Sequence, residues 1–171
     1  MEVRSRKLTV EEWLALNASL GGRSGGIPLE FAVTGYSMYP FLRSGRDRVT
    51  VLPVQRVLRV GDIVLFPAKS ARADYMLHRI VRKKGDWILT QGGRNPTPDF
   101  WMPADCVLGI AVRLERGDRV IHPQAASWRL AARIWMALRP IRPFLLRQVP
   151  WAAKLVRRGA AAEETEDTPG E

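Results

Sequence analysis

Short runs of alternating apolar and polar residues, separated by glycine-containing turns, fill the middle of this chain. The separating segments RSGR, RVGD, KKGD, GGRNPTPD and RGD combine residue types that favour tight turns. Many short strands joined by such turns are typical of a mainly β fold, a small barrel or a sandwich, and not of alternating strands and helices. The predicted strands span residues 29–33, 48–52, 62–66, 75–82, 87–91, 107–115 and 119–121.

The N-terminal pattern is helical instead. Thr9 and Glu12 have the spacing of a capping box, and Trp13 and Leu14 follow them directly. A short helix is therefore predicted here. The glycine-rich segment GGRSGG at residues 21–26 should end it in a flexible loop.

The C-terminal pattern is also helical. Apolar residues recur at i, i+3, i+4, i+7 and i+10, which marks one face of a helix. Prolines then divide the segment after residue 139 into two or three short helices. The apolar face consists of Trp128, Ala131, Ala132, Trp135 and Leu138.

These patterns divide the chain into four parts. Residues 1–28 hold the N-terminal helix and its loop, and residues 29–123 form the β-rich domain. Residues 124–158 form basic amphipathic helices. Residues 159–171 form an acidic segment that ends in AEETEDTPGE. It has too few large apolar groups to fold and is predicted to be disordered.

Composition narrows the cellular location that we expect for the protein. No stretch approaches the 18 or more apolar residues of a membrane span, and Glu11 and Glu12 stand where an export signal would need an apolar core. The single cysteine, Cys106, excludes an internal disulfide and provides no metal-binding spacing. We therefore expect a cytoplasmic protein without cofactor or metal, which could still contact the membrane surface from that side.

The net charge of +10 is concentrated in the C-terminal helices, where eight Lys or Arg residues and no acids lie between residues 125 and 158. In one interpretation Trp128 and Trp135 pack on the β domain while Arg129 and Arg133 face water. In another, the helix lies in a membrane interface, with its arginines on anionic lipid. Nucleic-acid binding is a weaker alternative, because no helix-turn-helix or aromatic RNA-binding motif accompanies the charge.

Three residues are candidates for hydrolytic chemistry. Ser37 follows a predicted strand, and a serine hydroxyl becomes a nucleophile only when a neighbouring base takes its proton. His78 lies within a strand, on the same face as Met76 and Ile80, and could be that base or simply a core histidine. Asp99, in a Gly- and Pro-rich loop, could orient the imidazole or could be only a turn residue.

Other polar residues have more ordinary interpretations. His122 precedes a proline at a strand end and is expected at the surface. Asp47 and Asp62 each precede a strand, where a carboxylate commonly caps a turn, and we expect structural roles for them.

Five segments, GYSMYPFLRSGRD, LRVGDIVLF, YMLHRIV, LTQGGRNPTPD and VLGIAVRLERG, resemble in order the boxes of the S24/S26 serine peptidases. This group includes type I signal peptidases and self-cleaving LexA-like repressors, and the resemblance covers about residues 31–120. It implies a β-rich, barrel-like fold with Ser37 as nucleophile. The box LHRIV resembles the branch of the group that uses histidine, so His78 would be the base and Asp99 the acid. Lys69 does not match the position of the lysine base.

The nucleophile segment would also bind the developing oxyanion, with the backbone N–H of Ser37 as its donor. In this loop Gly35 and Tyr36 precede the serine, and Met38 and Pro40 would shape and stiffen the chain after it. The chain departs from the family pattern at Gly93, where an aspartate is usual, so one orienting carboxylate is missing.

The sequence therefore predicts a serine endopeptidase that acts on a peptide or protein substrate. Two alternatives stay open. The first is a non-catalytic peptide-binding or membrane-surface module on the same scaffold, which the glycine at position 93 motivates because fold does not guarantee activity. The second is a regulator that cleaves itself, for which the segment LGGRSGG at residues 20–26 would be a flexible target.

Overall fold

The computed structural model describes residues 8–20, 25–70, 73–138 and 141. The chain divides into two compact units, Met1–Met136 and Ala137–Glu171, and the fold below is that of the first. The predicted helices beyond residue 141 and the predicted acidic tail lie outside the described residues.

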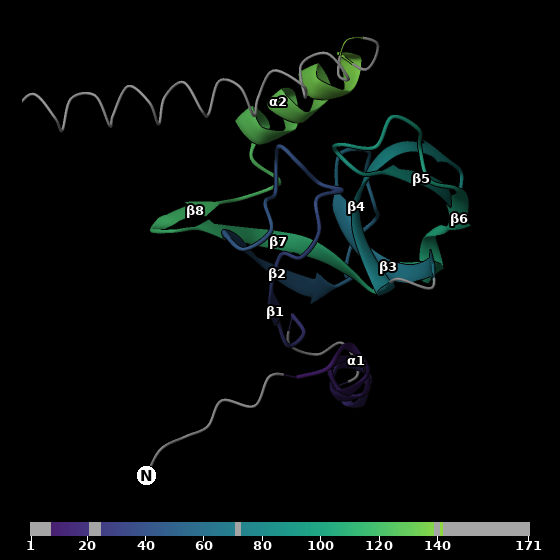
Figure 1. Ribbon diagram of the computed structural model, residues 1–171. Coiled ribbons are helices and arrows are strands. Elements are labelled where there is room, and N and C mark those ends of the chain that lie inside the picture. The colour runs from purple at the N-terminus through teal and green to yellow at the C-terminus, as the bar shows by residue number, and fades with distance from the viewer. Residues whose placement is uncertain (1–7, 21–24, 71–72, 139–140, 142–171) are drawn as a thin grey trace, which may run out of the picture. The chain divides into compact units, whose positions relative to one another are not determined.

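The first unit is built on one antiparallel sheet of eight strands (Figure 1). Its order is β1-β2-β7-β3-β4-β5-β6, and β8 pairs with β7 beside β3. The prediction of a mainly β fold is confirmed. The strands are β1 (Leu29–Ala32), β2 (Asp47–Pro53), β3 (Ile63–Ser70), β4 (Ala73–Lys84), β5 (Trp87–Gln91), β6 (Trp101–Pro103), β7 (Gly109–Arg116) and β8 (Arg119–Ile121).

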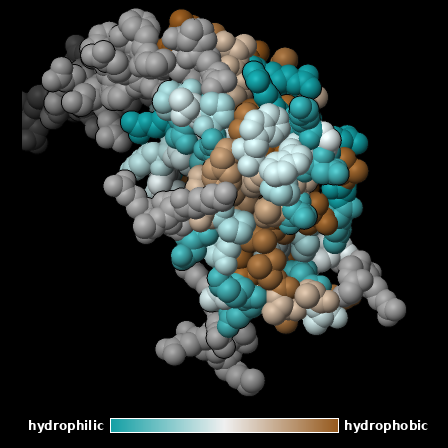
Figure 2. Space-filling view, turned by 90° about the vertical axis from the view of Figure 1, so that its right-hand side faces the viewer, coloured by the Kyte–Doolittle hydropathy of each residue, from teal (hydrophilic) through white to brown (hydrophobic). Residues whose placement is uncertain are grey.

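Strand β6 was not predicted from the sequence, since it follows a loop rich in glycine and proline and is only three residues long. It pairs with β5 from Leu89↔Trp101 to Trp87↔Pro103 and is followed by the single-turn helix η1 (Ala104–Cys106). Figure 2 shows the face on which β5 and β6 lie, with apolar residues between hydrophilic ones. Trp87 and Trp101 keep 51% and 43% of their surfaces exposed.

Strand β3 is apolar at successive positions because both of its faces are buried. Ile63 and Leu65 point into one core cluster, and Val64 and Phe66 point into a second. The first cluster also contains residues of β1, of β2 and of the segment after β1: Leu29, Val33, Met38, Leu42, Val49 and Val51. The second contains residues of β4, β5, β6 and β7: Ile80, Ile88, Met102 and Ile110. The sheet thus separates two apolar layers.

Helix α1 (Val10–Ser19) begins with the predicted capping box. Thr9 N donates to Glu12 Oε2 at 3.0 Å, and Glu12 N donates to Thr9 Oγ1 at 3.2 Å. Trp13 is completely buried in the first cluster, and its Nε1 donates to the Ile27 carbonyl at 2.6 Å. This bond and the packing around it fix the helix to the start of β1.

Helix α2 (Ala126–Ala137) confirms the predicted C-terminal helix. Trp128 and Trp135 are half-buried and both contact Phe41, which agrees with the interpretation that they pack on the β domain. Ala132 is buried as the spacing predicts, but Ala131 is exposed. Within the described residues no helix is both long and apolar enough to traverse a bilayer.

Candidate active site

The structure joins two of the three predicted catalytic residues directly. His78 lies on β4 opposite Val64 of β3, only 2% exposed, and its ring packs edge-on against Phe66. Its Nδ1 lies 2.7 Å from Asp99 Oδ2. An ionised carboxylate only accepts hydrogen bonds, so Nδ1 carries the hydrogen, and the lone pair of a neutral imidazole is then on Nε2.

Asp99 is held in place by residues that the sequence analysis did not select. Thr90 Oγ1 on β5 donates to Asp99 Oδ2 at 2.8 Å, and Asp99 N donates to the Thr90 carbonyl at 2.9 Å. The same Oδ2 therefore accepts from both Thr90 and His78. Thr90 is completely buried on a short strand of ordinary apolar pattern, and nothing in the sequence connects it with a loop residue nine positions later.

The pKa of Asp99 lies below its usual value. Burial acts to raise this pKa, but hydrogen bonds from His78, Thr90 and Asn95, together with the charge of His78, outweigh burial. Asn95 also belongs to the loop itself, where its carbonyl accepts from Gln91 Nε2 at 2.7 Å. The loop thus presents an ionised carboxylate to His78.

Ser37 lies in a compact loop of turns between β1 and β2. Val33 N donates to the Asp47 carbonyl at 2.9 Å where the loop leaves β1, and Leu42 N donates to the Met38 carbonyl at 3.1 Å. Met38 is buried in the first core cluster, as its predicted shaping role requires. Gly35 has φ +74°, a left-handed conformation that L side chains rarely adopt.

The loop after Pro40 is held by buried charge. Asp47 accepts from Arg43 N at 3.0 Å, from Arg46 Nε at 2.7 Å and from Arg116 Nε at 3.2 Å. Arg116 Nη2 also donates to the Phe41 carbonyl at 2.7 Å. The structural role predicted for Asp47 is confirmed.

The structural role predicted for Asp62 is confirmed too. Its carboxylate accepts two hydrogen bonds from Arg56, at 2.8 and 2.9 Å, and one from Arg59 N at 2.8 Å. His122, after β8, is exposed as predicted and does not line the groove described below.

The serine loop and the Asp99 loop pack backbone against backbone. Arg94 N donates to the Ser37 carbonyl at 2.8 Å. A Cβ added at Gly92 would lie 2.7 Å from the Ser37 carbonyl oxygen, and one added at Gly93 would lie 2.8 Å from that of Tyr39. This close approach therefore requires glycine at position 93, and the carboxylate that faces His78 is Asp99.

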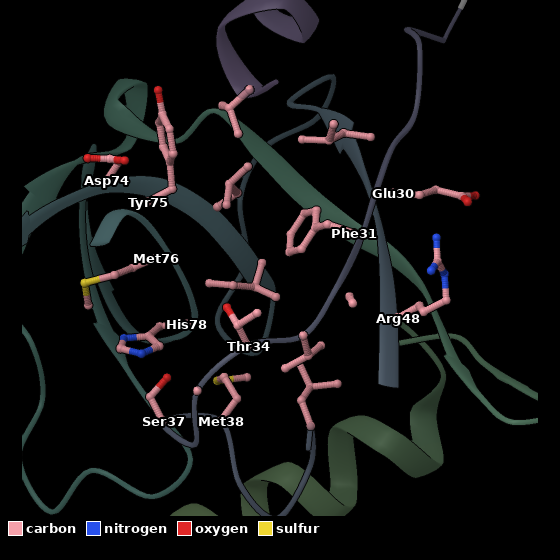
Figure 3. A pocket seen from close by; sticks show the side chains of 18 of the residues that line it. Glu30, Phe31, Thr34, Ser37, Met38, Arg48, Asp74, Tyr75, Met76 and His78 are labelled. Carbon is pink, nitrogen blue, oxygen red and sulfur yellow. The ribbon is translucent and has the colours of Figure 1, made fainter. Parts of the chain in front are cut away.

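Ser37 and His78 line the same groove, which has a volume of about 890 Å³. Figure 3 shows the Ser37 hydroxyl directed toward the His78 ring. No hydrogen bond joins these two side chains among the described residues. In enzymes without bound substrate, catalytic hydrogen bonds are often long and become shorter when substrate binds.

Two groups beside Ser37 are candidate hydrogen-bond donors to an oxyanion. The backbone N–H of Ser37 is the donor that the sequence predicts, and the hydrogen bond from Arg94 N fixes the peptide unit that follows it. Thr34, which sequence reasoning missed, also lines the groove, and Figure 3 shows its hydroxyl pointing into it. Its only sequence signal is a hydroxyl residue three positions before the serine.

The groove lies between two strand edges. Among the strands that the structure describes, β1 pairs only with β2, and the segment Asp74–Leu77 of β4 pairs only with β3. Residues from both segments line the groove, with Phe31 on one side and Tyr75 on the other (Figure 3). An unpaired strand edge can accept an extended peptide through backbone hydrogen bonds.

Comparisons with known proteins add no family. No protein-family model matches the sequence, and no curated protein matches it. Across the described ranges, no three His, Cys, Asp or Glu side chains come together as metal ligands would.

Proposed function

We propose that this protein is a serine endopeptidase of the S24/S26 type, with Ser37 as nucleophile, His78 as general base and Asp99 as the residue that orients His78. The observation that carries the proposal is the 2.7 Å contact between His78 Nδ1 and Asp99, beside a serine that lines the same groove. A buried imidazole held at one nitrogen by an ionised carboxylate has its other nitrogen free for proton transfer.

The steps follow from this arrangement. The Ser37 oxygen attacks the carbonyl carbon of the peptide bond while its proton passes to His78 Nε2. Asp99 stabilises the imidazolium, and the Ser37 N–H donates to the oxyanion, which in other enzymes is worth about 3–4 kcal/mol per donor. His78 then gives the proton to the leaving amine. Water hydrolyses the acyl ester, with His78 again as base.

The groove supports an extended peptide as substrate. Within the described part of the chain, the outer edges of β1 and of Asp74–Leu77 have no strand partner and can pair with a peptide strand. Side chains such as Phe31, Leu29 and Leu77 provide apolar walls. Main-chain pairing would provide affinity that does not depend on the sequence of the peptide. Alternate side chains of the peptide would enter the groove and provide selectivity.

Incubation of the purified protein with a complex peptide library, followed by mapping of new termini by mass spectrometry, tests the proposal. Ser37→Ala and His78→Ala are the matched controls. We expect new termini with the wild-type protein that are absent with both variants. Cleavage that persists unchanged in both would refute the proposal.

A peptide-binding module without catalysis is the second candidate. It is favoured by the missing hydrogen bond between Ser37 and His78 and by the two unpaired strand edges of the groove. Equal binding of a peptide by the wild type and by Ser37→Ala, with no product from either, would support it. Intact mass after prolonged incubation at raised pH separates both candidates from self-cleavage.

A further inference from the structure

Helix α2 contacts the two loops that hold the candidate nucleophile. Trp135 Nε1 donates to the Gly93 carbonyl at 2.8 Å. Phe41, four residues after the serine, makes edge-to-face contacts with both tryptophans of the helix, at centroid distances of 5.3 Å for Trp128 and 6.4 Å for Trp135. The helix thus contacts the serine loop through Phe41 and the Asp99 loop through Gly93.

The Gly93 contact leads directly to the nucleophile. The next residue, Arg94, donates its N–H to the Ser37 carbonyl at 2.8 Å. Gly93 itself packs so closely on the carbonyls of Met38 and Tyr39 that a methyl group would not fit between them. Two hydrogen bonds, both made by the Gly93–Arg94 peptide unit, therefore join the Trp135 indole to the Ser37 carbonyl.

Two further hydrogen bonds hold the helix and the residues before it to other parts of the β domain. Gln124 Nε2, two residues before α2, donates to the Ala111 carbonyl of β7 at 2.8 Å, and Arg129 Nη2 of α2 donates to the Val60 carbonyl, in the segment before β3, at 2.9 Å. Arg79, the neighbour of His78 on β4, places its guanidinium 5.0 Å from the centre of the Phe41 ring. The helix therefore bonds to the β domain at Val60 as well as at Gly93.

We propose that Trp135 is a positioning residue, which sets the place of Ser37 relative to His78 through Gly93 and Arg94. The inference rests on the proposed peptidase function. Its physical basis is that catalysis depends on the placement of the nucleophile within fractions of an ångström, and that a misplacement of about 1 Å can lower a rate about a hundredfold.

The test compares Trp135→Phe with Trp128→Phe. Both substitutions keep an aromatic ring beside Phe41, but only the first removes a hydrogen bond, because Trp128 Nε1 is buried without a hydrogen-bond partner among the described residues. Steady-state kinetics use a peptide cleaved by the wild-type protein, at a temperature where circular dichroism shows all variants folded. Hydrogen exchange of the segment containing Arg94 is measured in parallel.

We expect Trp135→Phe to lower kcat about tenfold with KM changed less than about twofold, and to accelerate exchange of the Arg94 amide. Trp128→Phe should leave kcat within about twofold and exchange unchanged. Equal effects of both substitutions, or no effect of Trp135→Phe on kcat and exchange, would overturn the inference. Cleavage that persists in Ser37→Ala would instead refute the proposed function, and the exchange data would still decide whether Trp135 fixes the loop.

Discussion

Replacing Gly93 with aspartate would introduce the residue that the S24/S26 pattern, which the sequence resembles, has at this position, and it separates two explanations of the glycine. If a catalytic aspartate is missing at position 93, the substitution should improve activity. If the glycine is required by packing, it should damage the site. The structure supports the second explanation, because Asp99 already contacts His78 at 2.7 Å.

The expected damage can be worked out from the contacts. A Cβ at Gly93 would lie 2.8 Å from the Tyr39 carbonyl oxygen and 3.0 Å from that of Met38, so backbone must move on one side. Overpacking of this kind costs about 1–3 kcal/mol of unfolding free energy. Gly93 is buried, and a carboxylate there would face carbonyl oxygens, which adds an unfavourable buried charge.

The assay is thermal unfolding together with kcat/KM on a cleaved peptide. Gly93→Ala should be destabilised by about 1–3 kcal/mol and Gly93→Asp by more, since only the second adds charge. Both should lose about a hundredfold or more in kcat/KM, because the displaced carbonyls lie next to Ser37. A Gly93→Asp variant as stable as wild type and more active would refute this reasoning.

Three further substitutions test other parts of the site. Asp99→Asn keeps the shape of the orienting residue but removes its charge, and steady-state kinetics should show kcat about a hundredfold to ten-thousandfold lower. Thr34→Val removes a hydroxyl that lines the groove, and kcat should fall about tenfold or more if that hydroxyl binds the oxyanion. Although burial acts to raise it, hydrogen bonds from Arg46 and Arg116 lower the pKa of Asp47. Ionised Asp47 therefore stabilises the fold above its unfolded pKa of about 4, and this stabilisation is lost as the pH falls through its lower folded pKa. Because Arg116→Met removes one cause of the lowered pKa, it should move the midpoint of acid unfolding to higher pH, which circular dichroism measures.

Local chemistry made much of the fold predictable from the sequence. The Thr9–Glu12 capping box and the glycine turns act within a few residues, so the first helix and seven of the eight strands could be assigned. Strand β6 could not, because its three residues gain their partner only when the preceding loop brings them beside β5. Ala131 has helical spacing but is exposed, whereas Trp128 of the same predicted face contacts Phe41.

The candidate site was predictable only as a set of residue types. Ser37, His78 and Asp99 could be selected by their chemistry and by family resemblance, and the structure brings His78 and Asp99 into contact. Thr90 and Trp135 could not be selected, because their hydrogen bonds to Asp99 and Gly93 join segments that only the folded sheet brings together. The reason for the glycine at position 93 is likewise a distance between backbones, which no local pattern contains.

A double-mutant cycle on Ser37 and His78 tests the central claim most directly. The kcat/KM of one cleaved peptide is compared for the wild type, Ser37→Ala, His78→Ala and the double variant. If the hydroxyl and the imidazole act as one unit, each single substitution should remove nearly all activity and the double variant should lose no more than either. Wild-type activity in either single variant, or losses that multiply as for independent sites, would contradict the account.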